Sequence, residues 1–74
     1  MKTRYRHIHF EEDTRMEVEG KITWFCRNNR DRSILGRITW YAPWRRWVFE
    51  AKPGCVFDYN CLRDVAGFLQ NELQ

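Results

Sequence analysis

Two histidines near the N-terminus are the first side chains in this sequence that could do chemistry. His7 and His9 stand two residues apart, so on a strand they would share a face and could bind a metal or act as a general base. No third ligand and no partnered nucleophile stands near them. A solvated turn explains Glu11, Glu12 and Asp13 more simply than cation ligation does. We therefore expect no metal, no cofactor and no catalytic residue, and we expect that the protein is not an enzyme.

The cysteines are the second candidate group. Cys26, Cys55 and Cys61 are odd in number and lack C-x-x-C spacing, so they predict neither a disulfide framework nor a zinc site. Reduced cysteines favour a cytoplasmic location. Cys61 has two interpretations: the dipole of the predicted helix lowers the pKa of its thiol, or it is a packed core residue.

Arginine and aromatic side chains supply the remaining chemistry. Thirteen Lys and Arg face ten Asp and Glu, for a net charge of +3, so a basic surface must come from clustering. Arg makes up most of these cations, which favours planar, bidentate contacts with phosphate or carboxylate. Residues 36–49, GRITWYAPWRRWVF, hold three of the four Trp and three Arg. There, Trp44 and Arg45 form the best candidate for an exposed anchor, with folding back over the core as the alternative.

Alternation of apolar and polar residues predicts the strands that position these groups. We expect strands over residues 5–10, 16–27, 34–41 and 46–51, with a turn over residues 11–14. Gly20 is either a bulge or a small residue on a crowded face. Whether two copies pair through the edge strand at residues 5–10 stays open.

An amphipathic pattern predicts a helix after the strands. Asp58 is the expected N-cap, the helix covers residues 58–73, and Gly67 inside it suggests close packing at that point. The predicted fold class is α+β: a three- to four-stranded antiparallel sheet with one C-terminal helix packed on one face. Residues 1–74 are expected to form a single domain.

The two faces of the predicted sheet differ in polarity. The helix should cover the more apolar face, which carries Ile22, Trp24, Cys26, Ile38, Trp40, Trp47 and Phe49. The other face should stay open and basic. With the hairpin turn, it supplies the predicted binding residues Phe25, Arg27, Arg37, Tyr41, Trp44, Arg45 and Arg46.

The stretch LGRITWYAPWRRWVF followed by FDYNCLRDVAGFLQNEL, residues 35–73, resembles small uncharacterised proteins of bacteriophages and other mobile elements. No activity comes with that resemblance. The predicted order of elements is also similar to the sheet-reading DNA-binding domains of tyrosine recombinases and of plant ethylene-response factors, which carry Arg and Trp to DNA on the exposed sheet face. This second resemblance implies comparable places for Arg27, Arg37, Arg46 and Tyr41. Trp40 and Trp47 depart from the pattern, because they are expected on the opposite face.

Two functions fit this pattern. The first is a non-enzymatic module of a mobile element that contacts nucleic acid through the open face, with arginines on phosphates or bases and aromatics stacking. The second is a protein-protein inhibitor of a host defence complex of the anti-CRISPR or anti-restriction type, because interface hot spots favour Trp, Tyr and Arg. No apolar run approaches the ~18 residues that span a bilayer, so no membrane partner is expected. A monomer or a weak homodimer is expected.

Overall fold

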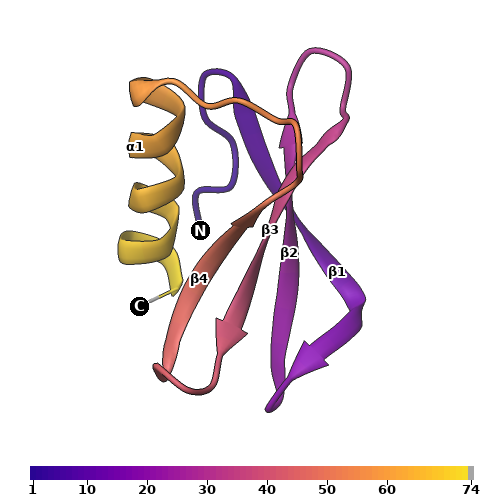
Figure 1. The fold of residues 1–74 in the computed structure, drawn as a ribbon, viewed down its shortest axis with the longest axis vertical. Coiled ribbons are helices and arrows are strands. Elements are labelled where there is room, and N and C mark those ends of the chain that lie inside the picture. The colour runs from indigo at the N-terminus through magenta and orange to yellow at the C-terminus, as the bar shows by residue number, and fades with distance from the viewer. Residues whose placement is uncertain (74) are drawn as a thin grey trace.

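The computed structural model describes residues 1–73 and shows an α+β fold (Figure 1). A four-stranded antiparallel sheet has the order β1-β2-β3-β4, so β1 and β4 form its two edges. The strands are β1 (Ile8–Val18), β2 (Lys21–Asn28), β3 (Ile34–Tyr41) and β4 (Arg46–Ala51). Helix α1 (Tyr59–Phe68) follows and continues into one π-helical turn, η1 (Leu69–Leu73). The predicted fold class is confirmed.

The first hairpin differs from the sequence prediction. Residues 11–14 lie inside β1, and the chain reverses at Glu19 and Gly20. Both residues have positive φ, 52° and 79°, as a type I′ turn requires. The predicted turn at residues 11–14 and the strand over residues 16–27 were therefore wrong, and Gly20 is a turn residue instead of a bulge. The turn was not recognised in the sequence because Asn or Asp, rather than a residue such as Glu19, usually precedes the glycine of a type I′ turn.

A bulge interrupts β1 before it reaches this turn. Asp13 pairs with Thr23 and Glu17 pairs with Ile22, so residues 14–16 have no partners on β2. This excess length kinks the edge strand and brings Met16 over the sheet face.

The core lies between the sheet and α1. Phe68 is fully buried, stacks on Phe10 with ring centroids 4.0 Å apart, and meets Trp24 edge to face at 5.2 Å. Trp47 and Phe49 pack against this cluster from β4. The expected assignment of faces is confirmed, since the tryptophans Trp24 and Trp47 lie on the helix side.

Asp58 caps α1 as expected. Its carboxylate accepts a hydrogen bond from Cys61 N at 2.9 Å. The expectation of close packing at Gly67 was wrong, because a Cβ built there would meet only Asn71 Nδ2, at 3.9 Å. In the described part of the chain, neither helical segment is both long and apolar enough to cross a bilayer.

Candidate functional site

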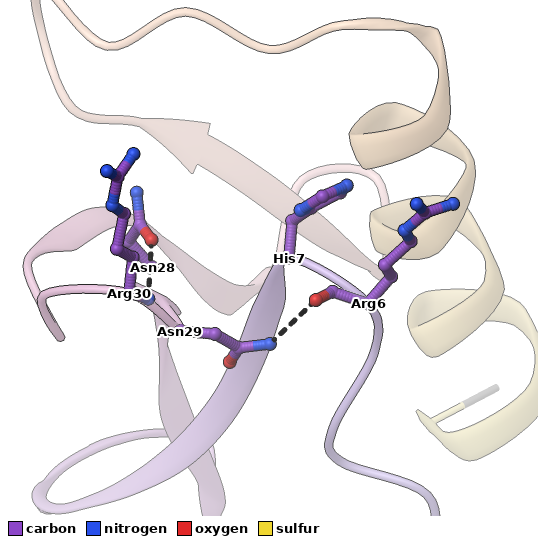
Figure 2. Close-up of a pocket in the computed structure, with 5 residues that line it drawn as sticks. All are labelled: Arg6, His7, Asn28, Asn29 and Arg30. Atoms are coloured by element: carbon purple, nitrogen blue, oxygen red, sulfur yellow. Dashed lines mark hydrogen bonds between the residues drawn. The ribbon is translucent and has the colours of Figure 1, made fainter.

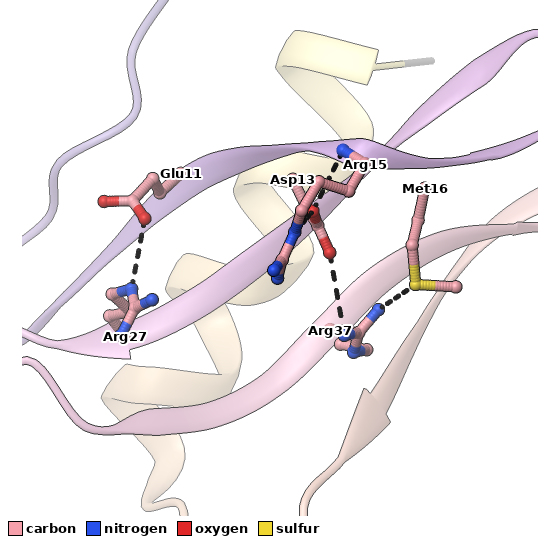
Figure 3. Close-up of polar contacts among 6 residues, drawn as sticks. All are labelled: Glu11, Asp13, Arg15, Met16, Arg27 and Arg37. Carbon is pink, nitrogen blue, oxygen red and sulfur yellow. Dashed lines mark hydrogen bonds and ion pairs between the residues drawn. The ribbon is translucent and has the colours of Figure 1, made fainter.

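The outer face of the sheet, opposite α1, carries two arginines that are already engaged (Figure 3). Arg27 Nε lies 3.3 Å from Glu11 Oε1. Arg37 Nη2 lies 3.6 Å from Asp13 Oδ2, and Arg37 Nη1 donates to Met16 Sδ at 3.0 Å. Asp13 is almost fully buried, and its Oδ1 also lies 3.3 Å from Arg15 Nε, so both arginines stabilise its charge. The centre of the outer face is thus largely neutralised by the acids of β1.

Phe25 lies between these two arginines. Its ring has a guanidinium carbon at 5.2 Å from Arg27 and at 4.9 Å from Arg37, and the residue is only 7% exposed. The expectation that Phe25 forms an open stacking platform was therefore wrong. Cation-π contact with both neighbours covers the ring, and this contact could not be deduced from strand alternation alone.

The β3–β4 hairpin turn holds the rest of the predicted site. Tyr41 is 41% exposed and Trp44 is 67% exposed, and their rings meet edge to face at 5.0 Å. Arg45 and Arg46 are exposed beside them. The seven predicted residues therefore form two groups, a covered central one and an exposed one at this hairpin. Trp44 does not fold back over the core.

A cleft at the opposite end of the sheet is lined by basic and neutral polar side chains (Figure 2). Arg6 and His7 line one side, and Asn28 and Arg30 line the other, with Asn29 at its base. Its volume is about 360 Å³, and none of its five lining residues is acidic. Such a cleft favours anions, because two arginines line it and no acidic residue does.

The backbone around this cleft is held by hydrogen bonds. Asn29 donates through Nδ2 to Tyr5 O at 2.8 Å and accepts through Oδ1 from His9 Nδ1 at 2.7 Å, which fastens the N-terminal segment to the β2–β3 loop. Arg30 N donates to Asn28 Oδ1 at 2.8 Å within that loop. The backbone around the cleft is therefore preformed, which lowers the ordering cost of binding a ligand there.

A second concavity of about 200 Å³ adjoins the first and shares Arg6 and His7 with it. Asn60, Arg63 and Asp64 of α1 complete its lining. Beside it, Tyr59 is 70% exposed, and the guanidinium carbon of Arg63 lies 5.5 Å from its ring centre. We call this surface the basic end and define it by Arg6, His7, Arg30, Tyr59 and Arg63.

Sequence reasoning missed the basic end because it misplaced the first hairpin. Ile8 pairs with Asn28, and this register places Arg6 and His7 beside Arg30, although they are more than twenty positions apart in the chain. Recognition of a turn at Glu19 and Gly20 would have produced this register. The signal was present in the sequence, in a less common form.

The other candidate groups are now placed. His9 is nearly buried on Asn29 while His7 is exposed, so the two do not act as a pair. Within residues 1–73 no three His, Cys, Asp or Glu side chains are grouped to hold a metal ion. Burial and the Asp58 carboxylate raise the pKa of Cys61, so the activated thiol considered above was wrong.

Comparisons with protein-family models, with curated proteins and with solved structures gave no match to this chain. The resemblance to phage and mobile-element proteins therefore stays a prediction, and the argument for function rests on the geometry of the surface.

Proposed function

We propose that this protein is a non-enzymatic module that binds nucleic acid through phosphates held at the basic end. The observation that carries the proposal is the cleft between Arg6, His7 and Arg30, which is preformed and has no acidic residue in its lining. The central outer face is a weaker candidate than the sequence implied, because Glu11 and Asp13 occupy its arginines.

The chemistry of these side chains matches a phosphodiester backbone. Guanidinium groups donate in a planar fork that fits two phosphate oxygens, so Arg6 and Arg30 can each hold a phosphate from one side of the cleft. The imidazole of His7 has an N–H to donate in either protonation state. Tyr59 lies beside the adjoining concavity and offers an exposed ring on which a base can stack.

Binding is tested by fluorescence anisotropy with labelled single-stranded DNA, single-stranded RNA and duplex DNA over a series of salt concentrations. The double variant Arg6→Gln/Arg30→Gln should bind more weakly than the unmodified protein. If both arginines contact phosphates of a single strand, the slope of log K against log salt should fall by about 1.4.

The matched control is Arg45→Gln/Lys52→Gln, which removes the same net charge from exposed positions outside the basic end. It should retain most of the affinity, since only non-local attraction is reduced. The proposal would be contradicted if the two double variants lost affinity equally. It would also be contradicted if the unmodified protein bound none of the three nucleic acids at low salt.

A second candidate function is supported by a different observation, the 67% exposure of Trp44 beside Arg45. Exposed Trp and Arg are typical anchors of protein interfaces, so the hairpin turn could bind a protein of a host defence complex and inhibit it. A pull-down from nuclease-treated host lysate, compared between the unmodified protein and Trp44→Ala, tests it. Under either function we propose a cytoplasmic, mobile-element protein, on the basis of its sequence resemblance and its free cysteines.

A further inference from the structure

The two edges of the sheet are finished differently. Along β1, residues 3–5 add a short paired segment: Phe10 N donates to Thr3 O at 2.8 Å, and Tyr5 N donates to Ile8 O at 2.8 Å. The bulge at residues 14–16 makes the rest of that edge irregular. Both features protect an edge from pairing with another strand. The edge at residues 5–10 is therefore not available to a second copy.

Strand β4 lacks these protections. It pairs with β3 in an uninterrupted register from Gly36 opposite Ala51 to Tyr41 opposite Arg46, with no bulge and no proline inside it. A hollow of about 260 Å³ lies along it, lined by Tyr41, Trp44, Val48, Phe49 and Glu50. β4 is thus a regular, open edge (Figure 1).

Hydrogen bonding in the β3–β4 ladder shows which backbone groups are free. Lys52 N donates to Leu35 O, and hydrogen-bonded positions alternate along an antiparallel pair. The even-numbered residues of β4 therefore bond to β3. Trp47 and Phe49 direct their N–H and C=O groups away from the sheet, toward the open edge.

The side chains of β4 carry opposite charges at equal distances from its centre. Arg46 precedes Val48 by two residues and Glu50 follows it by two, and both charged residues are exposed. Neither forms an ion pair with any residue of the described chain. Charged side chains can protect an edge, but opposite charges placed symmetrically about the centre of the strand are also complementary to a second copy of the same strand.

We propose that β4 pairs with β4 of a second copy of this chain, antiparallel and centred on Val48, to form a continuous sheet. In this register Trp47 of one copy exchanges both main-chain hydrogen bonds with Phe49 of the other, which uses the free backbone groups. Arg46 then lies opposite Glu50 of the second copy, and the two-fold axis repeats the pair. These positions are non-hydrogen-bonded pairs, where facing side chains approach most closely.

The same register also brings apolar side chains together on both faces of the strand. Val48 meets Val48 on the outer face, and the partly buried rings of Trp47 and Phe49 meet each other on the helix side. A shift of the centre to Phe49 would keep the backbone bonds but place Glu50 opposite Val48 and Arg46 opposite Lys52. Charge therefore selects the register centred on Val48, and both helices lie on the same side of the joined sheet.

Sedimentation equilibrium from ~10 μM to ~1 mM protein measures the association, a range that covers weak dimers. Arg46→Glu and Glu50→Arg each place like charges opposite one another twice, so each should weaken the dimer by about tenfold. The combined Arg46→Glu/Glu50→Arg variant should restore it. Arg63→Glu, the same charge change on α1, should have little effect. Native tryptophan fluorescence verifies that each variant is folded.

Disulfide trapping provides a second readout that does not depend on the charge variants. In a background with Cys55→Ser and Cys61→Ser, Val48→Cys should form a covalent dimer rapidly on mild oxidation, because the register brings its Cβ atoms together. Glu50→Cys should not, since it faces Arg46. A protein that is monomeric at ~1 mM, or equal cross-linking of the two cysteine variants, overturns the proposal. Failure of the double charge variant to restore a dimer also overturns it.

Discussion

Gly36 has no room for a side chain, and this makes its substitution a sensitive test of the sheet. A Cβ built on Gly36 would lie 2.6 Å from Glu50 O and 2.7 Å from ring carbons of Phe49 on the paired strand. The backbone oxygen belongs to the β3–β4 ladder and cannot move without disturbing it. Gly36→Ala should therefore separate the two strands locally and displace the Phe49 ring.

The expected cost follows from these contacts. Overpacking of this kind costs about 1 to 3 kcal/mol, and the lower chain entropy of alanine in the unfolded state offsets about 0.4 to 1 kcal/mol of it. A net loss of about 1 to 2 kcal/mol is large for a domain of 74 residues, whose total stability is on the order of 4 to 11 kcal/mol. In urea unfolding followed by tryptophan fluorescence, the midpoint should fall by about 1 to 2 M at an unchanged slope.

Gly67 supplies the matched control, because the same substitution should have the opposite sign there. Its built Cβ meets only Asn71 Nδ2 at 3.9 Å, an ordinary van der Waals contact, and it lies in the interior of α1. Gly67→Ala should raise the free energy of unfolding by up to about 1 kcal/mol through helix propensity. The reasoning is refuted if Gly36→Ala is as stable as the unmodified protein, or if Gly67→Ala is the less stable of the two variants.

Two further predictions concern titratable groups. Burial raises the pKa of Cys26 to about 12, so at pH 8 this thiol should react with iodoacetamide only when the protein unfolds. Cys55 is partly exposed and should react in the native state. Peptide mass spectrometry measures both labelling rates, and equal rates would disprove this prediction. The hydrogen bond from Cys61 N, with a smaller contribution from His7, lowers the pKa of Asp58 below its ordinary value. Its ionised form therefore stabilises the fold above a pH of about 4, and this contribution is lost as the pH falls further. The difference in melting temperature between the unmodified protein and Asp58→Ala should accordingly shrink from pH 7 to pH 2.5, and a constant difference would contradict the assignment.

Much of the fold could be predicted because its signals are local. Alternation along β3 and β4, the Asp58 N-cap and the helical apolar stripe each depend on a few neighbouring residues. The first hairpin was mispredicted because its position depends on the pairing register of β1 and β2, which is not a local signal. The run of acidic residues in β1 also resembled a turn, although it lies in a strand. Counting the apolar residues on each face of a strand could not show that Glu11 and Asp13 lie near arginines of other strands. That conclusion requires the strand pairing and its register.

The binding surface was harder to predict for the same reason. Exposure of Trp44 follows from its place in a turn, whereas burial of Phe25 depends on two arginines from its own and the neighbouring strand. Arg6 and Arg30 become neighbours only through the β1–β2 register. Surface chemistry therefore depends on long-range pairing, which a strand-by-strand analysis of one sequence does not include.

The stacking of Phe10 on Phe68 has a consequence for synthesis of the chain. These rings join the first strand to the last helix, so the core cannot close until α1 has left the ribosome. Until then the nascent sheet exposes Trp24, Trp47 and Phe49 to solvent, because the helix that covers them is missing. Folding should consequently be completed only after translation of the helix. The emergence of α1 from the ribosome, rather than the growth of each hairpin, should set the time at which the domain becomes resistant to proteases.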